Sequence, residues 1–229
     1  MQTIGFVTPV LPGKAEEARR WGKEMSGTRR REHTEAKKGS TIHHSRIWLQ
    51  QTPMGDLLVQ VIAADDMQRA FGQFISAKDP YGVWEKQQLQ TISGIDFNQP
   101  PPGMPEQLFD WQKGQGRNSL AFAAPIVAGK SEESRRWSKE AYVIRGKELE
   151  QSRLAKKLTR ESGWLNPTPA GDLLVVLLEG DDPVKGNREF AASKTPYDVW
   201  FKEKAQGITG IDFNQPLPAV PELVFDFRA

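Results

Sequence analysis

Three histidines are the residues best suited to acid–base chemistry, and all lie in the first half of the chain: His33, His43 and His44. An unperturbed imidazole titrates at about pH 6.5, so it exchanges a proton near neutrality with little tuning. Arg46 and Trp48 follow His44 at alternate positions. Alternate residues of a strand share one face, so the spacing predicts a proton acceptor beside an anion-binding guanidinium and an indole. His44 is therefore the expected catalytic residue.

A simpler interpretation places these side chains on an exposed strand end, where His and Arg commonly lie. A zinc site at His43 and His44 is disfavoured, because neighbouring strand residues point to opposite faces and no third ligand has suitable spacing. The chain has no cysteine, which excludes disulfides, thiolate metal sites and cysteine nucleophiles. It also has no serine-hydrolase, phosphate-loop, dinucleotide-binding or zinc-protease motif. We expect neither a metal nor a cofactor.

Seven tryptophans supply large apolar surfaces that either pack a core or line a pocket. Trp84 follows Tyr81 by about one helical turn, which puts both rings on one helix face. Arg29 precedes Glu32 by three positions, so an intrahelical ion pair competes with a ligand-binding role. In the functional interpretation a cavity lies between the sheet and helices of the first half. The residues expected to hold a ligand there are Arg29, Arg46, Trp48, Tyr81 and Trp84.

The sequence of the first half returns in the second. The segment GKAEEARRWGKE from Gly13 reappears as GKSEESRRWSKE from Gly129, and other segments repeat at the same spacing. The offset of about 116 residues far exceeds a solenoid repeat, so it predicts a duplicated domain. The stretch IDFNQP is identical in both halves. Its Asp96 and Asp212 are expected to bond the backbone before a Pro-rich turn.

The repeat sets the expected domain boundaries. We expect one unit over 1–111, a polar, glycine-containing linker over 112–118 and a second unit over 119–229. The three histidines have no counterparts in the second repeat, which suggests that the two units have specialised. The aligned residues are Leu149, Thr159 and Arg160.

Within each repeat the periodicity predicts strand, helix, strand, strand, helix, strand. In the first repeat these are a strand in TIGFVTPVL, a helix of about six turns from Lys14, strands over 41–51 and 57–63, a helix ending at Gly94, and a strand at LFDW. The order is that of a ferredoxin-like unit, with helices on one face of an antiparallel sheet. The third strand, LLVQVIA, is apolar on both faces, so its second face must also be covered. The predicted fold is α+β: two tandem ferredoxin-like βαββαβ units whose sheets pair into an α/β barrel.

With this pattern the chain resembles the dimeric α/β-barrel superfamily, in which two ferredoxin-like units pair their sheets. Members include antibiotic-biosynthesis monooxygenases, muconolactone isomerases, chlorite dismutases and aldoxime dehydratases. The signatures GK…RRW, PxGDLLV, PYxVW and GIDFNQP look like those of uncharacterised bacterial single-unit members. The resemblance implies a fold and a pocket position but matches no catalytic motif. Haem-binding relatives with tandem repeats take a histidine from the second unit, which has none here, so no haem is expected.

Charge and composition narrow the function further. A net charge of +2 does not give the one-sided field of a nucleic-acid-binding protein. No apolar run reaches the roughly 18 residues of a membrane span, and the start of the chain lacks signal-peptide features, so a cytoplasmic location is expected. We expect a small-molecule ligand, and either a monomer with an internal pseudo-dimer or a homodimer. The expected function is an enzyme without an organic cofactor, of monooxygenase, isomerase or cyclase type, acting on an aromatic or acidic metabolite; the alternative is a non-catalytic ligand-binding or sensing protein.

Overall fold

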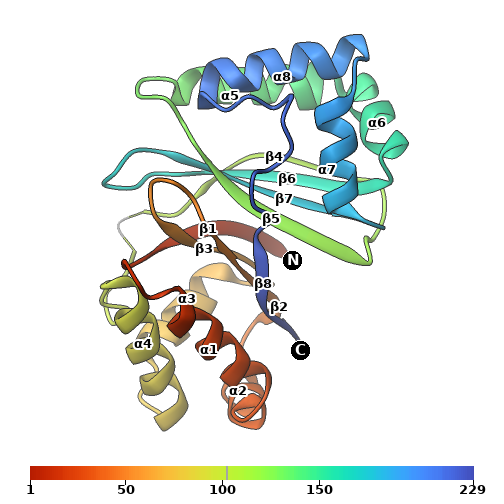
Figure 1. The fold of residues 1–229 in the computed structure, drawn as a ribbon. Helices are drawn as coiled ribbons and strands as arrows, with labels where there is room; N and C mark the ends of the chain where they lie inside the picture. The colour runs from red at the N-terminus through yellow and green to blue at the C-terminus, as the bar shows by residue number, and fades with distance from the viewer. Residues whose placement is uncertain (102) are drawn as a thin grey trace. The chain divides into compact units, whose positions relative to one another are not determined.

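The computed structural model describes residues 1–101 and 103–229, which form two compact units. Unit 1 comprises Met1–Met104 together with Pro221–Ala229, and unit 2 comprises Pro105–Val220. Each unit has one four-stranded antiparallel sheet with helices packed on one of its faces (Figure 1). The α+β class predicted from the sequence is confirmed. No helix in the described part of the chain combines the length and apolar character needed to cross a bilayer.

In the described residues of unit 1 there are four strands, in the order β1-β3-β2-β8, and four helices. Its elements are β1 (Gln2–Val10), α1 (Ala15–Ser26), α2 (Arg30–Lys37), β2 (Ile42–Gln50), β3 (Asp56–Ala64), α3 (Met67–Ser76), α4 (Pro80–Ser93) and β8 (Glu222–Arg228).

Unit 2 has the strand order β4-β6-β7-β5 and a π-helical segment, η1, between two of its α-helices. Its elements are β4 (Glu106–Gln112), β5 (Asn118–Pro125), α5 (Ser131–Lys139), η1 (Glu140–Ile144), α6 (Gly146–Ala155), β6 (Leu158–Asn166), β7 (Leu173–Gly180), α7 (Pro183–Ala192) and α8 (Pro196–Thr209).

The last strand of each sequence repeat belongs to the sheet of the other repeat. β4 ends the first repeat but hydrogen-bonds to β6, where Phe109 lies opposite Gly163. β8 ends the second repeat but hydrogen-bonds to β2, where Phe225 lies opposite Ile47. The compact units therefore differ from the expected boundaries of 1–111 and 119–229, because ladder hydrogen bonds exchange these two strands. The expected linker over 112–118 falls within unit 2, between β4 and β5.

The long helix predicted from Lys14 is not one continuous α-helix in either unit. In unit 1 it ends at Ser26 and restarts at Arg30, while in unit 2 it continues through η1. A wide turn lies at the same place in both: Arg29 N–H donates to Glu24 O at 2.8 Å, and Arg145 N–H donates to Glu140 O at 2.9 Å. The prediction of one continuous helix was wrong, because an α-helical pattern does not reveal an i→i+5 turn.

The segment PYxVW, which occurs in both repeats, forms the N-terminal part of the last helix in each unit. Asp79 caps α4 and accepts a hydrogen bond from Gly82 N–H at 2.9 Å, as its place before a proline predicts. The helix ends at Gly94, whose φ of 76° suits the left-handed position after a helix. Four residues after Gly82, Lys86 Nζ donates to Ile75 O and Ala77 O at 2.9 and 2.8 Å.

The loop GIDFNQP has the backbone-bonding role expected from its sequence. Asp96 Oδ1 accepts from Asn98 N–H at 2.9 Å, and Asp212 Oδ1 accepts from Asn214 N–H at the same distance. This turn directs the intervening phenylalanine inward. In unit 2 that residue, Phe213, packs against the hydrophobic core.

Candidate functional site

The expected site residues of unit 1 do not meet in one cavity. Arg29, Tyr81 and Trp84 lie together on the helix side of the sheet: the Arg29 guanidinium carbon is 4.3 Å from the Trp84 ring centre, and the rings of Tyr81 and Trp84 are 5.3 Å apart. Arg29 Nη1 also donates to Glu32 Oε2 at 2.8 Å. The guanidinium is thus engaged by a ring and a carboxylate, as the intrahelical interpretation predicts.

His44, Arg46 and Trp48 lie on the opposite face of β2. The helix-facing positions of this strand are Ile47 and Leu49, which pack in the core of unit 1 with residues of α1 and α4. Since side chains alternate along a strand, the residues between them point away from the helices. The structure therefore divides the six expected residues into two groups of three. The helix side holds Arg29, Tyr81 and Trp84, and the other face holds His44, Arg46 and Trp48.

His44 is held by the exchanged strand. Its Nε2 lies 2.7 Å from Asp226 Oδ1 on β8. Burial, with the positive charge of Arg46, lowers the pKa of His44, although Asp226 acts in the other direction. The imidazole is therefore tied into a cross-strand pair, with a reduced tendency to take up a proton.

His33 is more deeply buried than His44, with 2% of its surface exposed. Its Nδ1 lies 2.8 Å from Tyr81 Oη, and its ring makes edge contacts with Phe225 and Phe227. Burial and then the charge of Lys37 lower its pKa to about 3. A histidine that stays neutral among aromatic rings stabilises the core, and this position is Leu149 in unit 2.

A cavity lined mainly by apolar and aromatic residues lies in unit 2, between its sheet and its helices, with a volume of about 50 Å³. Apolar strand residues form its floor, including Phe122, Leu174 and Val176, and aromatic helix residues form its roof, including Trp137 and Phe201. The GIDFNQP loop contributes Phe213. Unit 2 therefore has a cavity between its sheet and its helices, the position that the sequence predicts for unit 1. The cavity of unit 1, with a volume of about 250 Å³, lies among α2, α3 and α4, and of the six expected residues Tyr81 alone is among its described lining residues.

A glycine on β6 shapes one wall of this cavity. A Cβ at Gly163 would lie 2.1 Å from the Phe109 ring, so only glycine lets that ring rest against the strand. Tyr142, from η1, then stacks on Phe109 with ring centres 3.9 Å apart and planes inclined by 8°. Unit 1 has Ile47 and Ser26 at the aligned positions. This pair of differences gives unit 2 its stacked aromatic wall.

Two hydrogen-bond donors in this wall are buried without a partner among the described residues, Trp137 Nε1 and Tyr142 Oη. Burial, followed by the nearby Glu161 carboxylate, raises the pKa of Tyr142 well above its usual value. The hydroxyl therefore keeps its proton and remains able to donate. Buried donors usually have partners, so a group that enters the cavity is the natural candidate to accept from them.

A buried ion pair borders the same cavity. The Arg153 guanidinium hydrogen-bonds to both carboxylate oxygens of Glu161. It also lies between two rings, 4.8 Å from the centre of Phe190 and 4.6 Å from that of Phe201. Planar, charged and stacked, Arg153 is well suited to a buried position.

Behind Arg153 a second carboxylate is enclosed by donors. Asp198 has none of its side chain exposed and accepts from Lys156 Nζ at 2.8 Å and Thr195 Oγ1 at 2.9 Å. The hydroxyls of Ser152 and Ser193 donate to it at 2.5 Å. This network fixes α6 against α8, and through Arg153 it fixes the cavity wall.

The residues of this cavity lie outside the motifs that the two repeats share. Tyr142, Arg153 and Glu161 align with Ser26, Lys37 and Ser45. Their signal lies in the differences: a tyrosine, an arginine and a glutamate appear together in one repeat only. The differences between the repeats were used for the histidines alone, which pointed to unit 1.

Solved structures with the same fold cover nearly the whole chain. A candidate monooxygenase from Fusobacterium nucleatum subsp. nucleatum matches with a TM-score of 0.53 at 8% identity, covering 99% of this chain and 93% of that one. An anthrone oxidase-like protein matches with a TM-score of 0.52 at 9% identity, covering 99% and 92%. At these identities the likeness shows the fold alone. No protein-family model and no curated protein matches the sequence.

Proposed function

We propose that the cavity of unit 2 binds a small aromatic molecule and that the protein acts on it as a monooxygenase without an organic cofactor. The observation that carries this proposal is the aromatic cavity containing Trp137 Nε1 and Tyr142 Oη, two donors that no described residue satisfies. The names of the two fold neighbours, a candidate monooxygenase and an anthrone oxidase-like protein, support the reaction class.

The cavity offers a ligand aromatic contact and hydrogen-bond donors. Tyr142 keeps its proton, and Arg153 already occupies the Glu161 carboxylate. A ligand that accepts hydrogen bonds from these donors therefore needs an acceptor atom, such as an oxygen. Donors aimed at such an oxygen would also stabilise negative charge that develops on it during reaction.

We also propose that the two repeats descend from a duplication and that their sheets pair as in an α/β barrel. The shared element order and the exchanged last strands support this arrangement. A chain that already contains both halves would be a monomer. Sedimentation at several concentrations tests the oligomeric state, and a mass twice that of the chain would favour the homodimer.

The second candidate function is ligand binding without catalysis. It is supported by the lining of the cavity: the described lining residues include no His, Lys or Asp, and their one carboxylate, Glu161, is paired with Arg153. The earlier proposal of His44 as base offers an alternative, and His44→Ala tests it directly. Loss of turnover without loss of ligand binding in that variant would return the chemistry to unit 1.

Two bicyclic probes test the binding site: naphthalene, which has no acceptor, and 1-tetralone, which has one carbonyl oxygen. Tyr142→Phe keeps the ring but removes the donor, so it should weaken 1-tetralone binding by about ten-fold, a loss of about 1.4 kcal/mol, and leave naphthalene unchanged. Tyr81→Phe removes a hydroxyl from unit 1 and serves as the control. Tryptophan fluorescence measures binding.

Oxygen uptake then separates the two functions. Monooxygenation consumes O2, so an oxygen electrode should register uptake when phenolic or ketonic aromatic compounds are added to the wild-type protein. Binding without uptake across such a panel would favour the non-catalytic function. Gly163→Ala, which displaces the Phe109 ring, should abolish both binding and uptake. If neither probe binds to the wild type, the proposed site is wrong.

A further inference from the structure

The cavity of unit 2 is too small for the ligand proposed for it. Its volume is about 50 Å³, enough for a few water molecules, whereas a benzene-sized guest occupies a cavity of about 150 Å³. A wall must therefore move before a ring can enter. This inference rests on the proposed function, and it concerns which wall that is.

Tyr142 is held in the cavity wall by ring contacts. Its ring stacks on Phe109 and makes edge contacts with Trp137 and Phe201, while its hydroxyl has no hydrogen-bond partner in the described ranges. The next two residues, Val143 and Ile144, are 70% and 73% exposed. Movement of this segment therefore uncovers little buried apolar surface beyond the tyrosine ring and Ala141, and the hydrogen bond that it breaks with α8 is that from Tyr197 Oη to Ala141 O at 3.2 Å. The floor residues, in contrast, belong to strands held by ladder hydrogen bonds, on both sides for β7 and on one side for the edge strand β5.

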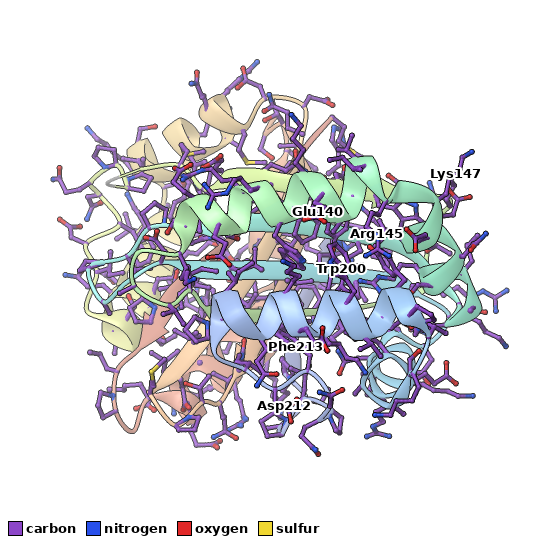
Figure 2. All side chains as sticks on the ribbon, turned by 90° about the horizontal axis from the view of Figure 1, so that it is seen from above. Glu140, Arg145, Lys147, Trp200, Asp212 and Phe213 are labelled. Carbon is purple, nitrogen blue, oxygen red and sulfur yellow. The ribbon has the colours of Figure 1, made fainter. Side chains whose placement is uncertain are left out.

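The end of the π-helical segment is anchored. Arg145 stacks on Trp200 and Tyr197, with distances of 4.0 and 4.9 Å from its guanidinium carbon to the ring centres. Two of its nitrogens hydrogen-bond to the two carboxylate oxygens of Glu148. Figure 2 shows Arg145 at the end of the segment that begins near Glu140, with Trp200 of α8 on the side of that helix that faces the segment. The segment can rearrange while α6 stays in place.

Unit 1 has the same segment with its helix broken. Arg29 stacks on Trp84 and pairs with Glu32, as Arg145 does with Trp200 and Glu148. Between α1 and α2 the helix is nevertheless broken at 27–29, although the wide turn that ends at Arg29 is kept. Gly27 stands where unit 2 has Val143. One chain thus contains a π-helical and a broken version of one anchored turn.

We propose that η1 is the entry gate of the unit 2 cavity. The π-helical turn unwinds toward the form seen in unit 1, Tyr142 leaves Phe109, and a ring enters in its place. The Arg145–Trp200 stack is the fixed end of the gate. When η1 reforms, Tyr142 Oη returns to the cavity and can donate to the ligand.

The absence of native cysteine allows a direct test. Ala205→Cys places a single thiol at a cavity-lining position that is 2% exposed, and Leu89→Cys places one at the aligned, buried position of unit 1. The rate of reaction with 4,4′-dithiodipyridine reports how often each thiol becomes accessible. We expect faster labelling at 205 than at 89, with only weak dependence on urea, because a local opening exposes little surface.

Val143→Gly introduces the unit 1 residue at an exposed position that does not line the cavity. Glycine weakens a helical turn, so this variant should speed labelling of the Ala205→Cys thiol by about five-fold and leave the Leu89→Cys thiol unchanged. It should also speed 1-tetralone association in stopped flow. Tyr142→Ala, which removes the moving ring, provides a second variant with the same expected direction.

The outcomes separate the gate from the site. If the Ala205→Cys thiol reacts no faster than the Leu89→Cys thiol, with the urea dependence of global unfolding, η1 is not a gate. The same conclusion follows if probes bind but Val143→Gly changes neither labelling nor association. If labelling is local and responds to Val143→Gly while neither probe binds, the gate stands and the proposed binding function fails.

Discussion

His44 Nε2 lies 2.7 Å from Asp226 Oδ1, although 182 positions separate the two residues along the chain. The pair joins β2 to the exchanged strand β8. In unit 2 the aligned pair is Arg160 and Asp110, 3.1 Å apart. In both sheets, therefore, an aspartate on the exchanged strand pairs with a basic side chain on the neighbouring strand, β2 in unit 1 and β6 in unit 2. Only the pair in unit 1 contains a histidine.

Asp226→Asn should lower the pKa of His44 further. Burial and Arg46 already lower it, and the Asp226 carboxylate opposes them, so removing that charge leaves only the lowering effects and the weaker amide. An NMR titration of the three histidines measures the change. Asp110→Asn, the matched change in unit 2, should leave every histidine titration as it is. An increase in the pKa of His44 in Asp226→Asn would contradict this account.

His33 should make the protein sensitive to acid. Its pKa is about 3 when folded and about 6.5 when unfolded, so between these values the unfolded state binds more protons. The free energy of unfolding should thus fall by up to roughly 1.4 kcal/mol for each pH unit below about 6.5. His33→Leu, which copies Leu149 of unit 2, should flatten this slope. Urea unfolding at pH 7 and pH 4.5 measures it.

The same variant leaves the Tyr81 hydroxyl without its partner, which costs about 1–3 kcal/mol at every pH. His33→Leu combined with Tyr81→Phe should recover part of that loss while keeping the flatter slope. A slope in His33→Leu equal to that of the wild type would show that other groups govern the acid response.

Lys86 and Lys202 should contribute similarly to stability. Each is buried, and each donates to two backbone carbonyls that follow or end the preceding helix; for Lys202 these are Ala191 O and Ser193 O at 2.9 and 2.8 Å. Substitution by Met keeps the aliphatic chain but leaves both carbonyls unsatisfied, so each variant should lose roughly 2–4 kcal/mol. Chemical denaturation measures both. A large loss in one unit only would indicate that the shared lysine has unequal roles.

Asp198→Asn should destabilise unit 2 by about 3–5 kcal/mol, because it leaves the buried Lys156 ammonium without its counter-charge. Burial alone would raise the pKa of Asp198, but hydrogen bonds from Lys156, Ser152 and Ser193 hold it at about 2. The stabilisation by this carboxylate is therefore present above pH 4 and lost as the pH falls toward 2. Urea unfolding of the wild type and Asp198→Asn at pH 7 and pH 3 measures both the destabilisation and its pH dependence. An equal loss of stability at pH 7 and pH 3 would contradict the expected pH dependence.

Asp198→Asn combined with Lys156→Met is the control for this network. Removing both charges should cost less than the single change, since no buried ion remains unpaired.

Local chemistry made much of the fold predictable. Three local features formed as their residue types predict. Asp79 caps the helix that begins at Pro80, Gly94 ends that helix, and Asp96 accepts a backbone hydrogen bond in its turn. The exchange of β4 and β8 was beyond prediction from pattern, because a strand sequence does not name the sheet that it joins. The π-helical turn was missed because a single i→i+5 turn within a helix has no residue pattern of its own.

The site was harder to predict than the fold. Alternation correctly put His44, Arg46 and Trp48 on one face, but the choice between the two faces depends on which side the helices cover. Ile47 and Leu49 decide it, because they belong to the same hydrophobic core as Trp21 of α1 and Ile92 of α4. The cavity of unit 2 depends on a missing side chain, since Gly163 makes room for Phe109. Such a void becomes visible only when the neighbouring strands are in place.

The strand exchange also determines what a protease cut would do. A single cleavage between β4 and β5, within residues 113–117, would give two fragments, each carrying a strand that the other fragment's sheet uses as an edge. The nicked chain would stay together as a noncovalent complex, and separation would strip one edge from each sheet. Separately produced halves should accordingly fold on mixing, because each half supplies the edge strand that the sheet of the other half lacks.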